Sequence, residues 1–391
     1  MNVAIVGQGY VGLPLAIAAA SAGHSVIGID SNPKLVAKLN AGRSPITDIA
    51  DAAIVKCQES GNYSATDTFD SIRQAEVIVI CVPTPLDDSY NPDLAALRSA
   101  LSTVASNLKS GSLVIVESTV APGTTRTIVS ELLSVSGVIF DLAYSPERID
   151  PANKSWSVTN TPKLVAGLTQ GAADRAANFY QTFVSSVTIG SSLEVIETAK
   201  LLENSFRLIN ISFINEIAQF CAALKIDARE VIDAAATKPY GFMPFYPSAG
   251  VGGHCIPVDP KYLSHSAEQL GVTSRFIDLA HEVNLSLPTY FAGVATGILN
   301  GLANKKILLI GIAYKPDVAD SRETPAKGLL ATLRAAGAQV SWHDDLVQVW
   351  NGESSSPISA GYDLAILVNP HSHSDLTLLG SVPVLNTRGG Y

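Results

Sequence analysis

The chain has 391 residues, 47% hydrophobic and 16% charged, which is typical of a globular protein with two or three domains. The formal net charge is −9 and Lys and Arg do not cluster, which argues against a nucleic-acid partner or an anionic membrane surface. No apolar run reaches roughly 18 residues and no signal peptide is evident, so we expect a cytoplasmic protein without membrane insertion. Four scattered cysteines predict neither disulfides nor a bound metal.

A glycine-rich loop near the N-terminus predicts a dinucleotide-binding domain. Gly7, Gly9 and Gly12 suit a tight turn, a close approach of the pyrophosphate and close packing of the following helix. Asp30 ends the second predicted strand, where its carboxylate can accept hydrogen bonds from ribose hydroxyls and would repel a 2′-phosphate, so NAD is favoured over NADP. The segments in order are the strand Val3–Val6, the loop Gly7-Gln8-Gly9-Tyr10-Val11-Gly12, a helix to about Ala22 and the strand Ser25–Asp30.

Three further predicted strands end in polar or turn residues, and in a doubly wound sheet such ends face the ligand. The strands are Glu76–Val82, which breaks at Pro83 and Thr84, then Leu113–Thr119, and Gly137–Ala143, which leads to Glu147. Thr119 and Glu147 together can hold a water molecule. Alternatively, Thr119 caps the next segment and Glu147 is a solvated loop charge.

A helix is predicted from Leu193 to Leu224, because no Gly or Pro interrupts an apolar pattern of helical spacing. Lys200 and Asn204 are four residues apart, so they share one face and can converge on an oxyanion, unless they form an ordinary polar stripe. So long an apolar helix favours a homodimer. Further helices are expected over Asp227–Ala236 and over Thr273–Leu287, the latter stopped or kinked at Pro288.

Cys255 ends a glycine-rich loop within Pro247–Pro260. A thiol beside a hydride acceptor can trap an aldehyde as a thiohemiacetal, and a second oxidation then gives a thioester. The alternative is a small buried apolar side chain. Asp259 and Pro260 fit the first two positions of a helix, with Asp259 as its N-cap, although Asp259 can also assist the chemistry.

The last part of the chain repeats a βαβ pattern but lacks the second and third glycines, which argues against a second dinucleotide site. Asn351–Pro357 reads as a surface loop, and His371 and His373 as an exposed turn without an acidic partner. The expected segments are the strand Lys306–Tyr314, a helix over Thr324–Ala336, and the strands Gln339–Asp345, Asp363–Val368 and Val382–Asn386.

The predicted fold is therefore α/β with three domains. An N-terminal Rossmann domain for NAD covers residues 1–190, a central long-helix domain with the dimer contact and the Cys255 loop covers 191–298, and a Rossmann-like domain covers 299–391.

Several motifs together resemble the UDP-glucose/GDP-mannose dehydrogenase family, in order and over nearly the whole chain. This resemblance implies oxidation of a nucleotide-sugar 6-hydroxymethyl group to the carboxylate, with two NAD reduced and a C-terminal domain that binds UDP. The motifs are Gly7–Leu13, Val82–Pro85, Glu117–Thr119, Ser145–Glu147, Lys200 with Asn204, Gly250–Cys255, Tyr314–Asp317 and Asp320–Arg322.

The resemblance also implies residue roles. Cys255 is the nucleophile, Lys200 and Asn204 stabilise the oxyanion, Thr119 and Glu147 position water and accept a proton, and Asp259 orders the thiol or the water. The implied NAD-binding residues are Gly7, Gly9, Tyr10, Val11, Gly12, Asp30, Pro83, Thr84 and Thr119. The implied substrate-binding residues are Glu147, Arg148, Lys200, Asn204, Arg207, Gly252, Lys315 and Arg322.

Two departures from the UDP-glucose pattern resemble the UDP-N-acetylhexosamine branch. His254 precedes Cys255, at the position where Ser is usual. Pro151 lies one helical turn after Glu147, at the position where a second Glu is usual. UDP-N-acetylglucosamine is therefore the expected substrate, with UDP-N-acetylmannosamine or UDP-glucose as alternatives. Arg207 either reaches an N-acetyl carbonyl or is a surface or interface cation, and Lys315 and Arg322 resemble groups that face the uridine diphosphate.

Two other classes of function remain open from the sequence. A two-electron dehydrogenase of the β-hydroxyacid type also pairs a Lys/Asn helix with a Rossmann domain, but it has no need of Cys255. A non-catalytic NAD-binding regulator would not need Lys200, Asn204 or Cys255.

Overall fold

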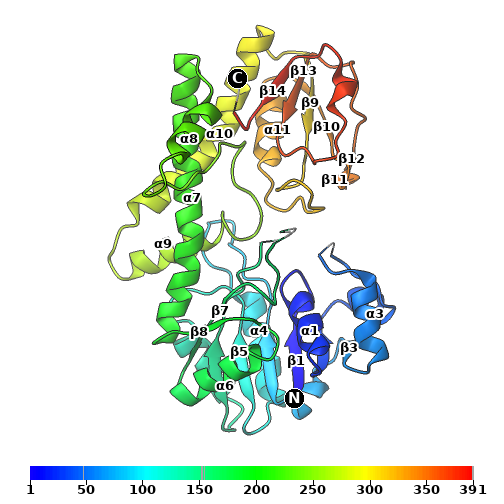
Figure 1. The fold of residues 1–391 in the computed structure, drawn as a ribbon, viewed down its shortest axis with the longest axis vertical. Helices are drawn as coiled ribbons and strands as arrows, with labels where there is room; N and C mark the ends of the chain where they lie inside the picture. Colours follow the sequence, from blue (N-terminus) through cyan, green and yellow to red (C-terminus); the bar gives the residue numbers. More distant parts are fainter. Residues whose placement is uncertain (47, 151–152, 154, 390–391) are drawn as a thin grey trace. The chain divides into compact units, whose positions relative to one another are not determined.

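The computed structural model describes residues 1–46, 48–150, 153 and 155–389. The fold is α/β, as predicted (Figure 1). The chain divides into two compact units, Met1–Leu202 and Glu203–Tyr391, while the division into three domains stays a prediction. Pro151, one of the two branch-specific departures, lies outside the described residues.

The first unit is built on an eight-stranded sheet. Its order is β3-β2-β1-β4-β5-β6-β7-β8, and every neighbouring pair is parallel except β6 with β7. The chain reverses direction across the sheet after β3, so the carboxyl ends of β1 and β4 flank the crevice in which such folds bind ligands. The strands are β1 (Asn2–Val6), β2 (Ser25–Ile29), β3 (Tyr63–Thr66), β4 (Val77–Ile80), β5 (Leu113–Val116), β6 (Asp141–Tyr144), β7 (Lys163–Gly167) and β8 (Val187–Ile189).

Helices cover both faces of this sheet, which explains why its central strands are apolar at every position. Val3 and Ile5 of β1 pack into a core with α1 and α6, whereas Ala4 and Val6 pack into a second core with α4 and α5. The helical segments are α1 (Gly12–Ser21), α2 (Pro33–Asn40), α3 (Asp51–Glu59), η1 (Asp70–Gln74), α4 (Ala95–Asn107), the π-helical η2 (Thr125–Val129), α5 (Ser130–Ser134) and α6 (Gln170–Tyr180).

The long helix α7 (Leu193–Leu224) has the bounds predicted from the sequence. Its first ten residues belong to the first unit and the rest to the second. Asp227 caps the next helix, α8 (Ala228–Ala236), by accepting the Arg229 N–H at 2.8 Å.

The second unit contains a four-stranded parallel sheet of order β10-β9-β13-β14. One core joins this sheet to α10 and α11, and a smaller core lies on its other face. The remaining elements are α9 (Asp259–Gln269), α10 (Arg275–Leu299), β9 (Lys306–Ile310), α11 (Ala326–Ala335), β10 (Gln339–His343), β11 (Val349–Trp350), β12 (Glu353–Ser354), β13 (Leu364–Leu367), η3 (Leu376–Leu379) and β14 (Val384–Asn386).

Three local expectations were wrong. Helix α10 continues past Pro288 to Leu299, so of the predicted stop or kink the stop is wrong; the Pro288 ring packs against Gly328. The surface segment 351–357 contributes β12 to a small antiparallel pair with β11. Strand β6 begins only at Asp141, not at Gly137, because Gly137 adopts a positive φ of 69°.

In the part of the chain that the structure describes, no helix is both long enough and apolar enough to cross a membrane.

Gly12 and Gly9 of the first loop differ in the space available for an added methyl group. At Gly12 an added Cβ would lie 1.8 Å from the Gly7 carbonyl oxygen, whereas at Gly9 no atom lies within 4 Å. We expect Gly12→Ala to lower the free energy of unfolding by about 1–3 kcal/mol, as overpacking does, in urea titrations without cofactor. Gly9→Ala is the matched control and should unfold within about 0.5 kcal/mol of wild type. Equal unfolding curves for the two variants would contradict this packing argument.

Candidate active site

The first loop has the geometry that a dinucleotide pyrophosphate requires. Gly7 has a φ of 92°, and a Cβ there would lie 2.4 Å from the Cys81 carbonyl oxygen, so only glycine fits. Gly9 is exposed, and the space beside it is open. Asp30 follows β2, and its Oδ2 accepts the Gln8 N–H at 2.9 Å. The residues present therefore fit NAD, with the pyrophosphate at the start of α1.

The other predicted residues of the first unit follow neighbouring parallel strands. Pro83 and Thr84 come after β4, Thr119 after β5 and Glu147 after β6, so sheet topology brings all of them to the edge that carries Gly7. The Ser118 hydroxyl donates to the Val82 carbonyl at 2.7 Å and links two of these strand ends.

Glu147 is held by its own loop. Its Oε1 accepts the backbone N–H groups of Arg148 at 2.5 Å and Ile149 at 2.6 Å, and its Oε2 lies 3.3 Å from Lys163 Nζ. The Arg148 guanidinium donates to the Pro162 carbonyl at 2.7 Å. Glu147 is thus an ordered, half-buried carboxylate rather than the freely solvated charge that the sequence left open.

The sequence assigned no role to three residues near Glu147, namely Glu117, which lies in a family motif, Lys163 and Tyr180. All three are buried, and the Tyr180 hydroxyl donates to Glu117. The sequence gives only a weak indication of this cluster. Glu117 and Lys163 are charged residues next to apolar runs, but the sequence does not show that they are partners.

Helix α7 carries buried polar groups at helical spacing. Lys200 is 7% exposed and Asn204 9% exposed, so they are not an ordinary solvated stripe. One turn earlier, the buried Glu197 accepts the N–H groups of Gly123 at 2.6 Å and Thr125 at 2.9 Å. Glu197, which the sequence analysis also missed, therefore fixes the loop that follows Thr119.

The loop before Cys255 is packed against the C-terminal part of its own unit. At Gly252 a Cβ would lie 2.6 Å from the Glu323 carbonyl oxygen, and at Gly253 it would lie 2.9 Å from the Tyr314 ring. Two asparagines fix the start of the loop: Asn215 accepts the Ser248 N–H and Asn284 accepts the Val251 N–H, both at 2.9 Å. Cys255 is exposed, so the alternative of a buried apolar cysteine is wrong.

Asp259 begins α9 but does not cap it. The N-cap residue is Val258, and no side chain supplies a cap hydrogen bond. The buried Asp259 carboxylate instead accepts from Asn204 Nδ2 at 2.5 Å, and the Asp259 N–H donates to the Cys255 carbonyl at 2.8 Å. The expected N-cap role is wrong because the side chain is turned to α7, and Asp259 links Asn204 to the backbone of Cys255.

Arg322, predicted to face the uridine diphosphate, forms a bidentate ion pair with Asp320, with Nη2 2.6 Å from Oδ2. His254 Nε2 lies 3.9 Å from the same Oδ2, and burial together with the Arg322 charge lowers the pKa of His254. Lys315 lies in the same loop region between β9 and α11.

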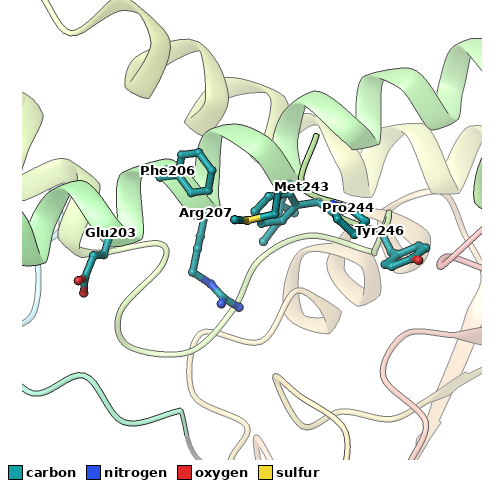
Figure 2. A pocket seen from close by; sticks show the side chains of 8 residues that line it. Glu203, Phe206, Arg207, Met243, Pro244 and Tyr246 are labelled. Carbon is teal, nitrogen blue, oxygen red and sulfur yellow. The ribbon is translucent and has the colours of Figure 1, made fainter. Parts of the chain in front are cut away.

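Arg207 lines an open cavity of about 610 Å³ in the second unit. Figure 2 shows Glu203, Phe206 and Arg207 on α7, with Met243, Pro244 and Tyr246 from the segment that follows α8. Arg207 is exposed there and is not folded into the protein interior.

The second βαβ loop also binds the carboxylate that follows its second strand. Asp344 Oδ2 accepts the N–H groups of Ile312 at 2.7 Å and Ala313 at 2.9 Å, much as Asp30 Oδ2 accepts that of Gln8 in the first loop. The expectation that the C-terminal domain holds no second dinucleotide rests on its missing glycines and stays a prediction.

His371 was wrongly predicted to lie in an exposed turn without an acidic partner. Its side chain is 0% exposed, with Nε2 2.8 Å from Asp344 Oδ1. Nδ1 accepts the Asp317 N–H at 2.8 Å, so Nε2 carries the hydrogen that is donated to Asp344. His373 is exposed, as predicted, and stacks on the His371 ring, but it also has an acidic partner, since its Nε2 lies 3.9 Å from Asp345 Oδ2. The acidic partner was missed because it precedes His371 by 27 residues.

None of the four cysteines, all of which lie in the described residues, forms a disulfide bond. Among the residues that the structure describes, no three His, Cys, Asp or Glu side chains are grouped so that they could hold a metal ion.

Comparison with known families matches three successive segments to the UDP-glucose/GDP-mannose dehydrogenase family. Residues 1–184 match its NAD binding domain, 194–286 its central domain and 308–376 its UDP binding domain. A UDP-N-acetyl-D-mannosamine dehydrogenase of Pyrococcus horikoshii is 32% identical over 382 residues, which cover 95% of this chain and 90% of that protein. A UDP-N-acetyl-D-glucosamine 6-dehydrogenase of Pseudomonas aeruginosa is 34% identical over 392 residues, with 95% and 91% covered.

The same relationship is found among solved structures. The structure described as UDP-D-ManNAc dehydrogenase from Pyrococcus horikoshii matches with a TM-score of 0.90 at 29% identity, over 99% of this chain and 95% of that one.

The Asp344 contacts predict a pH dependence of stability. Burial alone would raise the pKa of Asp344, but hydrogen bonds from His371 and the backbone lower it from the usual 3.8 to about 2. The ionised carboxylate therefore stabilises the fold above pH 4, and this contribution is lost as the pH falls towards 2. We expect Asp344→Asn to lower the free energy of unfolding by about 2 kcal/mol at neutral pH, and by progressively less below pH 4.

The measurement is urea unfolding as a function of pH. Asp88→Asn, at an exposed loop position, serves as the control and should change the unfolding free energy by less than about 0.5 kcal/mol. A deficit for Asp344→Asn that stays constant down to pH 2 would show that its ionisation has no part in the effect.

Proposed function

Because the chain belongs to the UDP-glucose/GDP-mannose dehydrogenase family and is an NAD-dependent oxidoreductase, we propose that it oxidises the C6 hydroxymethyl group of a UDP-N-acetylhexosamine to the carboxylate. The observation that carries this proposal is an exposed thiol, Cys255, at the end of a closely packed glycine loop. A two-electron alcohol dehydrogenase has no use for such a nucleophile, whereas oxidation to an acid does.

Bound NAD supplies hydride acceptance, once in each of the two oxidation steps. The Cys255 sulfur adds to the C6 aldehyde and forms a thiohemiacetal, and loss of the second hydride leaves a thioester. Water attacks the thioester carbon, the C–S bond breaks, and the acid leaves while a proton returns to the thiolate. Four electrons leave the sugar in total, so two NAD are consumed for each acid.

Lys200 and Asn204 stabilise the oxyanion in this proposal. Both are nearly buried, and a cation and an amide aimed at developing charge act more strongly away from water. An amide nitrogen carries two hydrogens, of which the Asp259 contact uses one. Asp259 thereby orients Asn204, a role better supported by its contacts than direct action on the thiol.

Thr119 and Glu147 position the water and accept its proton. Glu147 suits this because its carboxylate is fixed by backbone donors at a ligand-facing sheet edge. Arg148 helps to hold the same loop through Pro162. Gly252 allows the loop before Cys255 to pack closely, and Lys315 and Arg322 bind the diphosphate.

UDP-N-acetylglucosamine is our preferred substrate. Relatives that act on the gluco and the manno sugar are similarly distant, at 34% and 32% identity, so the choice between these epimers stays a prediction. Arg207 is exposed beside an open cavity, which is compatible with donation to an acetyl carbonyl and equally with the alternative of a surface or interface cation. The cytoplasmic location also stays a prediction.

We expect wild-type protein to reduce NAD with UDP-N-acetylglucosamine, and with UDP-N-acetylmannosamine as the next candidate, more rapidly than with UDP-N-acetylgalactosamine or UDP-glucose. Cys255→Ser should lower acid formation by at least about 1000-fold, the order expected for loss of a nucleophile. The measurement combines NADH absorbance with chromatographic detection of the sugar acid.

Cys221→Ala is the matched control, since this cysteine is buried in a small apolar cluster, and it should retain activity. Turnover of UDP-glucose alone would overturn the choice of branch. Normal acid formation by Cys255→Ser would exclude the thioester route. Unchanged NADH formation by this variant without any acid as product would favour a two-electron dehydrogenase, and NAD binding without turnover of any of the four sugars would favour a regulator.

We further propose a homodimer through α7. Exposed apolar side chains recur on this helix every four or seven residues, which places them on one stripe. Such a stripe is typical of a helix that packs against another helix. The residues are Val195, Leu202, Phe206, Phe213, Phe220 and Leu224.

Phe213→Glu with Phe220→Glu should raise the dimer dissociation constant by at least about 100-fold, because carboxylates would be buried without partners. Sedimentation equilibrium measures this change. Val135→Glu introduces the same charge at an exposed apolar position outside α7 and should leave the dimer intact. A double variant that remains dimeric would place the interface elsewhere.

A further inference from the structure

We propose that Lys163 is a positioning residue for Glu147, and that Glu117 and Tyr180 hold Lys163 in place for that purpose. This inference rests on the proposed function, because it assumes that Glu147 positions the hydrolytic water. Lys163 opens β7, and its Nζ lies 2.9 Å from Glu117 Oε2 and 3.3 Å from Glu147 Oε2. One ammonium thus bridges a fully buried carboxylate and a carboxylate that is 14% exposed.

The buried partner is engaged on both oxygens. Glu117 Oε2 accepts from Lys163, and Glu117 Oε1 accepts from the Tyr180 hydroxyl. Tyr180 belongs to α6, and Glu117 follows β5, so two separate elements fix the position of the ammonium. Burial disfavours its charge, but Glu117 and Glu147 outweigh burial and raise the pKa of Lys163.

The contact between Lys163 and Glu147 restricts the Glu147 carboxylate. Two backbone N–H groups bind Glu147 Oε1, so the carboxylate can still move only by rotation and displacement of Oε2. Lys163 limits that freedom from the other side. Arg148 adds a second tie between the same two segments through Pro162, the residue before Lys163.

The charges explain why an ammonium is needed. Glu117 and Glu147 repel each other, and Lys163 is the cation that faces both. Cys81 also faces the cluster, but burial raises the pKa of its thiol, so it is neutral there and adds no charge. Without Lys163, Glu147 Oε2 would lose its ammonium donor and the carboxylate could rotate about Oε1, so the water that it holds would be misplaced whether or not Glu117 is charged.

The test separates this role from simple burial of an ion pair. Lys163→Met alone leaves Glu117 buried without its cation and can fail to fold. Lys163→Met combined with Glu117→Gln removes both charges, and Tyr180 can still donate to the amide oxygen. We expect this double variant to keep its melting temperature within a few degrees of wild type and to lose about 10- to 100-fold in kcat for acid formation. KM for the UDP-sugar should change less than about twofold. The single variant Lys163→Arg, which keeps the positive charge, should retain most of the wild-type kcat.

The assay uses full-length protein, NAD and the UDP-sugar that wild type oxidises fastest. Arg175→Met with Asp141→Asn is the matched control, since it removes another ion pair of the same unit that does not contact Glu147, and its kcat should be unchanged. Glu147→Gln is measured in parallel. A slow Glu147→Gln with a normal double variant would overturn the positioning role alone, whereas a normal Glu147→Gln would overturn the proposed role of Glu147 and this inference with it.

Discussion

The catalytic proposal depends first on one uninterrupted helix. Because α7 has no Gly or Pro, it places Glu197, Lys200 and Asn204 on a common stripe, three and four residues apart. Each of these groups is buried. Glu197 fixes the loop beyond Thr119 and Asn204 binds Asp259, so a break in this helix would disturb the polar residues of both compact units.

The two Rossmann-like loops share a carboxylate that follows the second strand. In the first loop, Gly9 leaves open space beside the start of α1, and a cofactor phosphate can approach. In the C-terminal loop, Asp344 takes the N–H groups itself, and His371 and the backbone keep its charge stable. The carboxylate after the second strand thus accepts loop N–H groups in both units, from Gln8 in the first and from Ile312 and Ala313 in the second.

Local patterns in the sequence predicted most of the fold, including both ends of α7 and the glycines of the first loop. They failed where distant residues decide the outcome. Asp259 is drawn away from its expected cap position by Asn204, which lies 55 residues earlier in the chain. Lys163 and Glu117 are 46 residues apart, so only the folded sheet reveals their contact. Single positions indicated which residues are reactive, but not which ones hold them in place.

The central claim is that Cys255 carries a sugar through two successive oxidations to the acid. Its most direct test is the number of NADH molecules formed for each UDP-N-acetylglucosamine consumed, measured at completion with the sugar limiting. The thioester route predicts a ratio of two, with the uronic acid as the product and no free aldehyde. A ratio of one, with an aldehyde or ketone as the product, would contradict it.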